Sequence, residues 1–146
     1  TKTDMGALVW DNTAGEWRTS SFAIGKPVFC NVRERFDDAA GTSVVCEDEQ
    51  IFHLDMSAFT GNIGIDITGL NLTAYLSTTV TFVCDNSSGT SHVTNAITID
   101  GAAVNLMWQG GSVAVGTANA HDIVTFSIMR MADNSYKAFG NIVSYS

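Results

Sequence analysis

The chain has 146 residues, a formal net charge of −8 and only 15% charged residues, against about 25% in average soluble domains. This length suits one domain with a core of its own, and the acidic balance disfavours nucleic acid and anionic lipid, which bind through clustered Lys and Arg. No apolar run approaches the roughly 18 residues of a membrane-spanning helix, so no membrane partner is expected.

The residue composition predicts an all-β fold. Val, Ile and Thr together contribute 39 residues, whereas Leu contributes 6. β-Branched side chains lose freedom in helices and pack well on a pleated surface. The chain also has 13 Gly and 10 Asn, which tolerate positive φ in tight turns. High Ser, Thr and Asn with few charges is typical of extracellular and virion β-proteins.

The first predicted element is a hairpin within residues 1–25. Residues 7–10 and 16–18 have strand composition, and the stretch 11–15 between them has turn composition. Trp10 and Trp17 are expected to face each other across the two strands. Because a lone hairpin is marginal in water, we interpret residues 1–25 as an arm or linker and residues 26–146 as the main domain.

The region from residue 26 to residue 61 is harder to interpret. Pro27 opens an apolar stretch, as suits the first residue of a strand. Residues 33–41 and 47–49 are charged, and their carboxylates suggest either a calcium site or a solvated acidic turn. We favour the turn, because the spacing matches no EF-hand loop.

The three cysteines are Cys30, Cys46 and Cys84. Their spacing leaves a Cys30–Cys46 bridge open. The preferred interpretation is that all three are small buried apolar side chains.

From residue 62 onward, short strands alternate with polar turns. Residues 63–67 place three isoleucines on one face, and Asp100-Gly101 is a two-residue turn signal. Evenly spaced short strands predict a sandwich or barrel. The expected fold is an antiparallel β-sandwich, jelly-roll-like, with the N-terminal hairpin as an arm.

The C-terminal stretch 119–146 is the best-defined element, and we predict a β-hairpin with its turn at residues 132–135. Apolar side chains occupy both faces of the return strand, with Phe139, Val143 and Tyr145 on one and Ile142 on the other. We therefore expect this strand to be covered on both sides, by a second sheet or by a neighbouring subunit.

No motif in the sequence indicates catalysis. There is no nucleophile elbow, no P-loop and no zinc-binding spacing of Cys or His. His53, His92 and His121 lie far apart, and a metal site built from one of them in each chain of a trimer is the weaker alternative. We expect no enzymatic activity, no cofactor and no metal.

Three aromatic residues near predicted turns are candidate ligand contacts. Trp108, Tyr136 and Tyr145 offer apolar ring faces on which sugars stack. Packing in a core or interface is the alternative for each of them.

The C-terminal half resembles a module at the ends of bacteriophage tail-fibre and other virion appendage proteins. The residues that carry the resemblance are Trp108-Gln109-Gly110-Gly111, the stretch Thr117-Ala118-Asn119-Ala120-His121-Asp122-Ile123-Val124-Thr125-Phe126, and Asp133-Asn134-Ser135-Tyr136. Residues 8–17 resemble a linker hairpin upstream in such fibres. About half of the chain takes part, and residues 33–61 have no counterpart.

This resemblance implies a structural virion protein, a module of a tail fibre, spike or decoration protein. It implies assembly as a homo-oligomer, with a trimer expected, contacts to other virion proteins and a role in host attachment. The alternative is a monomeric carbohydrate-binding adhesin that contacts a cell-surface glycan. A hydrolase that cuts surface polysaccharide is the weakest of the three hypotheses.

Overall fold

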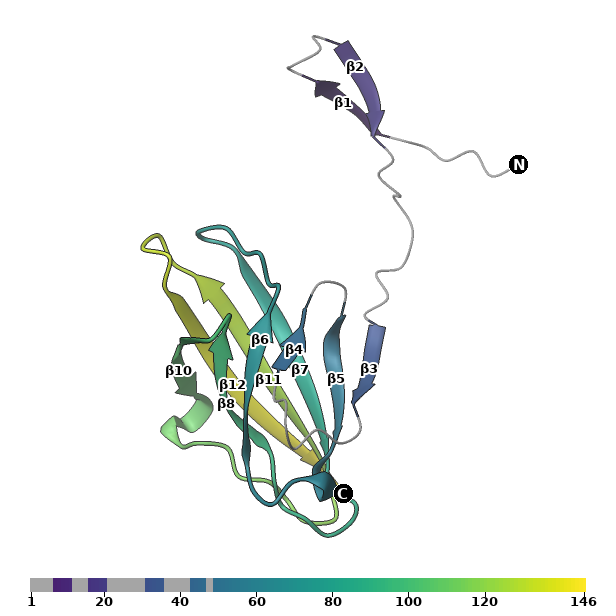
Figure 1. Cartoon of the computed structure of the whole chain (residues 1–146), viewed down its shortest axis with the longest axis vertical. Coiled ribbons are helices and arrows are strands. Elements are labelled where there is room, and N and C mark those ends of the chain that lie inside the picture. Colours follow the sequence, from purple (N-terminus) through teal and green to yellow (C-terminus); the bar gives the residue numbers. More distant parts are fainter. Residues whose placement is uncertain (1–6, 12–15, 21–30, 36–42, 47–48) are drawn as a thin grey trace, which may run out of the picture.

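The computed structural model describes residues 7–11, 16–20, 31–35, 43–46 and 49–146 (Figure 1). Its regular structure is almost entirely strand, which confirms the all-β prediction. The strands are β1 (Ala7–Asp11), β2 (Glu16–Ser20), β3 (Asn31–Arg35), β4 (Ser43–Val45), β5 (Glu49–Asp55), β6 (Ile63–Thr68), β7 (Ser77–Asp85), β8 (Thr94–Ile99), β9 (Ala102–Ala103), β10 (Asn105–Trp108), β11 (His121–Arg130) and β12 (Tyr136–Tyr145).

Two short 3₁₀ helices are the helical elements of the described part, η1 (Met56–Ala58) and η2 (Gln109–Gly111). None of the described residues belongs to a helix long and apolar enough to cross a membrane.

Strands β1 and β2 form a two-stranded sheet of their own, as predicted for the N-terminal hairpin. They pair antiparallel, and the backbone of Trp10 lies directly opposite that of Trp17. Several predictions fall outside the described residues, namely the turn after β1, the stretch from Pro27 to Cys30, most of the charged segment 33–41 and the acidic turn at 47–48. The calcium alternative and the Cys30–Cys46 pairing therefore stay predictions.

Strands β3 to β12 form a six-stranded sheet, in the order β10-β12-β11-β7-β5-β3, and a four-stranded sheet, in the order β4-β6-β8-β9. From β3 to β8 the chain adds strands to the two sheets alternately (Figure 1). Each time the chain passes from one sheet to the other, it reverses direction. Strands two apart in sequence therefore lie in the same sheet and run in the same direction. Accordingly, β3 with β5, β5 with β7, β4 with β6 and β6 with β8 all pair in parallel.

The prediction of an antiparallel arrangement is therefore wrong for the strands from β3 to β8, which we call the wound part of the chain. Alternation of apolar and polar residues fixes which face of a strand is buried. It does not fix which sheet the next strand joins, and that choice sets the direction of pairing. The stretch that follows the turn at Asp100 and Gly101 is divided between the two sheets, because β9 pairs with β8 while β10 pairs in parallel with β12.

The C-terminal hairpin is confirmed in position and in pairing. Strands β11 and β12 pair antiparallel without a register shift from His121 opposite Tyr145 to Arg130 opposite Tyr136. At the turn, Asn134 has a φ of 64°, and the backbone N–H of Ser135 donates to the Asp133 carboxylate at 3.0 Å. Strand β11 also pairs antiparallel with β7, so the hairpin continues the wound part of the six-stranded sheet.

One hydrophobic core receives side chains from both sheets. In the four-stranded sheet Ile67 and Ile99 are fully buried, and in the six-stranded sheet Phe52, Phe82 and Phe126 are too. We call the face of the six-stranded sheet that carries these phenylalanines its inner face, and the opposite one its outer face.

Aromatic rings form a row across the inner face. The ring centroids of Phe52 and Phe82 are 5.5 Å apart, those of Phe82 and Phe126 are 6.0 Å apart, and those of Phe126 and Trp108 are 5.6 Å apart. Gly140 lies opposite both Phe126 and Trp108 in register. A Cβ atom at Gly140 would lie 2.7 Å from Cε3 of Trp108. The glycine therefore makes the space in which the indole completes the row.

Candidate functional site

The three predicted ligand residues do not come together in one site. Trp108 and Tyr136 are partly buried and pack against the core, whereas Tyr145 is 58% exposed. Tyr136 and Tyr145 are the first and last residues of β12, about 30 Å apart at the usual rise of a strand. The guanidinium of Arg130 lies over the Tyr136 ring, 5.4 Å from its centroid. Packing thus accounts for Trp108 and Tyr136, and Tyr145 remains as an exposed aromatic residue.

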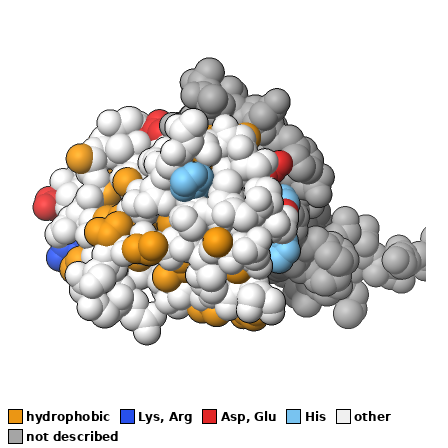
Figure 2. Space-filling model, turned by 90° about the horizontal axis from the view of Figure 1, so that it is seen from below, with side chains coloured by type: hydrophobic (Ala, Val, Ile, Leu, Met, Phe, Trp, Pro, Cys, Tyr) orange, Lys and Arg blue, Asp and Glu red, His pale blue; other side chains and the backbone are white. Residues whose placement is uncertain are grey.

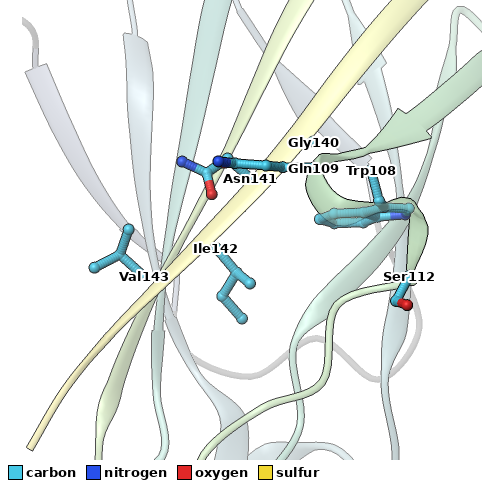
Figure 3. Close-up of a pocket in the computed structure, with 7 residues that line it drawn as sticks. All are labelled: Trp108, Gln109, Ser112, Gly140, Asn141, Ile142 and Val143. Carbon is cyan, nitrogen blue, oxygen red and sulfur yellow. The ribbon is translucent and has the colours of Figure 1, made fainter.

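A shallow hollow lies beside Trp108 on the described surface. Its volume is about 390 Å³, and its lining combines the indole with the polar residues Gln109, Ser112 and Asn141 and with Gly140, Ile142 and Val143 of β12. Figure 3 shows the Trp108 ring beside Gly140, with Ile142 and Val143 farther along the same strand. An aromatic face next to amide side chains offers both stacking and hydrogen bonding to a small polar ligand.

The outer face of β10 and β12 carries exposed apolar side chains. The exposed fractions are 39% for Met107, 43% for Phe139, 45% for Val143 and 58% for Tyr145. Met107 lies opposite Phe139 in register. Val143 and Tyr145 follow on the same face of β12, beyond the polar Asn141. We call these four residues the assembly face. Apolar residues therefore do occupy both faces of β12, but in the single chain only the inner face is covered.

Charge is scarce beside the middle of this face. On β11 the outward neighbours Ile123, Thr125 and Ser127 are uncharged, whereas His121 lies opposite Tyr145 at one end and Lys137 precedes Phe139 on the same side of β12 at the other. A contact made here would bury little charge.

A buried pair, Asn86 and Asp122, ties the loops at one end of the sheet together. Both side chains are fully buried, and the Asn86 amide donates to Asp122 Oδ2 at 2.8 Å. The same oxygen accepts the backbone N–H of Thr117 at 2.8 Å, and the Ser144 hydroxyl donates to Oδ1.

This pairing explains the motif at residues 119–122 in structural terms. Asp122 fixes the segment that enters β11, and Asn119 adopts a φ of 58° in that turn. The motif therefore has the turn-forming role that its residues predict.

Two of the three histidines come together around a carboxylate that sequence reasoning did not single out. Asp85 Oδ1 lies 3.5 Å from His121 Nδ1, and Asp85 Oδ2 lies 3.9 Å from His53 Nε2. His92 takes no part, and its backbone hydrogen-bonds with the Asn86 side chain instead. Strand alternation predicts that the side chains of His53, Asp85 and His121 point outward. Only the pairing of β5, β7 and β11 places these three side chains together.

The cysteines in the described part behave as apolar residues. Cys46 and Cys84 are both buried, as the preferred interpretation expects. Burial raises the pKa of the Cys84 thiol from 9.0 to about 11. Because the thiolate is the reactive form of cysteine, this thiol is poorly suited to act as a nucleophile at neutral pH.

No protein-family model matches the chain, and neither a curated protein nor a solved structure matches it. The virion resemblance therefore stays a prediction.

Proposed function

We propose that this chain is a structural module of a virion appendage and that it assembles with copies of itself through the assembly face. The observation that carries the proposal is the row of exposed apolar side chains on β10 and β12, Met107, Phe139, Val143 and Tyr145. The virion assignment comes from the residues of the C-terminal half that resemble fibre-end modules, and that resemblance makes a trimer the expected assembly.

The chemistry of the face suits a protein interface. Interface cores are enriched in aromatic residues and Met and depleted of Lys, Glu and Asp. The assembly face has a Phe, a Tyr, a Met and a Val, and three of its neighbours on β11, Ile123, Thr125 and Ser127, are uncharged. Contiguous exposed apolar residues on a folded domain mark sites that a partner covers.

A second copy of the same chain is the partner that the charges favour. Each chain has a net charge of −8, so copies repel one another wherever their acidic residues meet. Self-association is then easiest through a face without charge, and the assembly face is such a face. It also belongs to strands that are held firmly on their inner side by Trp108 and Phe126, whose ring centroids are 5.6 Å apart.

The fold proposed for this role is a sandwich of the two sheets. The support is the single core cluster to which Ile67 and Ile99 of one sheet and Phe82 and Phe126 of the other belong. In this sandwich the parallel winding from β3 to β8 takes the place of the jelly-roll order that the sequence predicts.

Sedimentation velocity on the full chain tests the assembly. We expect a trimer at micromolar concentration and a monomer for the double variant Phe139→Ser/Val143→Ser, with an unchanged circular dichroism spectrum. The matched control is Tyr75→Ser/Leu76→Ser, which removes two apolar residues that are 80% and 53% exposed but lie outside the face. A wild-type monomer, or equal dissociation of the control, contradicts the proposal.

The virion assignment needs a separate experiment. An antiserum against the chain should label a fibre, a spike or the outer shell of purified virus particles from its source in electron micrographs. If the chain forms oligomers but labels no particle, the assembly face is retained and the virion role is rejected.

The hollow beside Trp108 favours a second candidate function, the binding of a cell-surface glycan. Its test is a glycan array with the wild type, Gln109→Ala and Asn141→Ala, since these amides line the hollow. Trp108→Ala is a weaker probe, because the indole also packs on Phe126. Glycan binding that both amide variants lose, while the oligomeric state is unchanged, supports this candidate. Absence of binding rejects it.

A further inference from the structure

His53, Asp85 and His121 form a compact cluster on the outer face of the six-stranded sheet. They come from three adjacent strands, β5, β7 and β11, with β7 in the middle. His121 lies directly opposite Asp85, and His53 lies opposite Val83, two residues before Asp85 on the same face. Figure 2 shows histidine and acidic side chains next to one another at one edge of the view.

The spacing of their ligand atoms suits a metal ion. One nitrogen of each imidazole and one carboxylate oxygen all lie within 4.8 Å of one another. Four-coordinate zinc, with bonds of about 2.0–2.1 Å, holds neighbouring ligand atoms roughly 3.3 Å apart. The distances of 3.5 Å and 3.9 Å from Asp85 to the two histidines are close to this value.

Hydrogen bonds from Ser87 hold the Asp85 carboxylate in place. The backbone N–H of Ser87 donates to Asp85 Oδ1 at 2.9 Å. Hydrogen bonds from the hydroxyl and backbone of Ser87 lower the pKa of Asp85 below its ordinary value of 3.8, and His121 and His53 lower it further. Ligating carboxylates are commonly held by such an outer hydrogen bond.

We propose that His53, Asp85 and His121 bind one divalent transition-metal ion of the zinc type. Two imidazoles and one carboxylate favour zinc, copper, nickel or iron over calcium and magnesium, which take mostly oxygen ligands. The site is open, since the exposed side-chain fractions are 25% for His53, 23% for Asp85 and 51% for His121. A water molecule or a residue of another chain completes the coordination.

Such an ion would tie together strands that are far apart in sequence. His53 belongs to the parallel, wound part of the sheet, and His121 begins the C-terminal hairpin. Because the ion binds the folded chain, its affinity contributes directly to the stability of the fold. The site thus clamps the hairpin to the rest of the sheet.

Isothermal titration of the full chain with zinc chloride tests the proposal. We expect one ion per chain and a higher melting temperature in its presence. His53→Ala and His121→Ala should each lower the affinity by more than the roughly 10–100-fold that loss of an outer hydrogen-bond partner costs. Asp85→Asn keeps the size of the side chain and should also weaken binding. The matched control is His92→Ala, which removes a histidine outside the cluster and should bind as the wild type does.

Several results of these titrations would overturn the metal-site proposal. No zinc binding by the wild type, binding that survives both cluster histidine variants, or an equal loss in His92→Ala overturns the proposal. Millimolar magnesium or calcium should not compete with zinc, and competition contradicts the assignment to the zinc type. The monomeric variant Phe139→Ser/Val143→Ser should still bind zinc, so the outcome for the metal site is separate from that for the assembly face.

Discussion

The two faces of the six-stranded sheet differ in what their side chains do, although the residues alternate along the same strands. On the inner face Phe82 and Phe126 are completely buried, with their ring centroids 6.0 Å apart. On the outer face the same two strands carry Thr81 and Thr125, whose hydroxyls are 3.5 Å apart. The inner face therefore holds the side chains that stabilise the fold, while side chains on the outer face stay partly exposed.

The largest effect should follow from a cavity in the inner face. Phe82 lies in the middle of the aromatic row and is completely buried, so Phe82→Ala should lower the free energy of unfolding by about 3–5 kcal/mol. The control on the outer face is Thr81→Ala in the same strand, for which we expect a loss below about 1 kcal/mol. Urea unfolding followed by circular dichroism measures both. Equal losses in the two variants would contradict the claim that the inner face contributes more to stability than the outer face.

A polar residue on the inner face should have the next largest effect. Asp122→Ala leaves the Asn86 amide and the Thr117 N–H without their shared acceptor, and buried donors left unpaired cost about 1–3 kcal/mol. The matched variant Ser144→Ala removes a single donor to Asp122 and should cost less. Urea midpoints of the two variants show which one loses more stability. A larger loss in Ser144→Ala would contradict the central role given to the Asp122 carboxylate.

The third effect depends on pH and comes from Cys84, another buried residue of β7. Its pKa is raised from 9.0 to about 11 by burial, so above pH 9 the unfolded chain loses this proton first. Stability present below pH 9 is then lost as pH rises toward about 11, by about 3 kcal/mol at most. Cys84→Ala should lack this part of the decline. Urea unfolding of both proteins at several pH values from neutral to alkaline measures it, and parallel curves would contradict the pKa shift.

The sequence predicts the local elements of this fold well because local rules determine them. The C-terminal hairpin follows from alternation and from the turn around Asn134, and Asp100 and Gly101 adopt the positive φ values of 48° and 75° that their turn signal implies. Burial of Ile65 and Ile67 follows from the alternation in β6.

The parallel winding and the metal cluster could not be predicted in the same way. Both depend on which strands become neighbours, and that is decided by packing between residues distant in sequence. Nothing near His53 indicates that its strand will lie beside the one that ends at Asp85. Similarly, the role of Gly140 becomes clear only when β10 places Trp108 against it.

The smallest effect on stability should come from the assembly face. Phe139 and Ala138 are neighbours in β12, yet Ala138 is fully buried and Phe139 is 43% exposed. Phe139→Thr replaces an aromatic residue with another residue that favours strands. We expect the free energy of unfolding to change by less than about 0.5 kcal/mol at a protein concentration low enough for monomers.

At higher protein concentration, the same variant tests whether Phe139 takes part in association. The melting temperature of the wild type should rise with protein concentration, because association stabilises the folded chain by mass action, while that of Phe139→Thr should stay constant. A loss above about 1 kcal/mol in the dilute monomer would mean that Phe139 supports the core of its own chain. The division between a stabilising inner face and an outer face free for partners would then fail at the strand where it matters most.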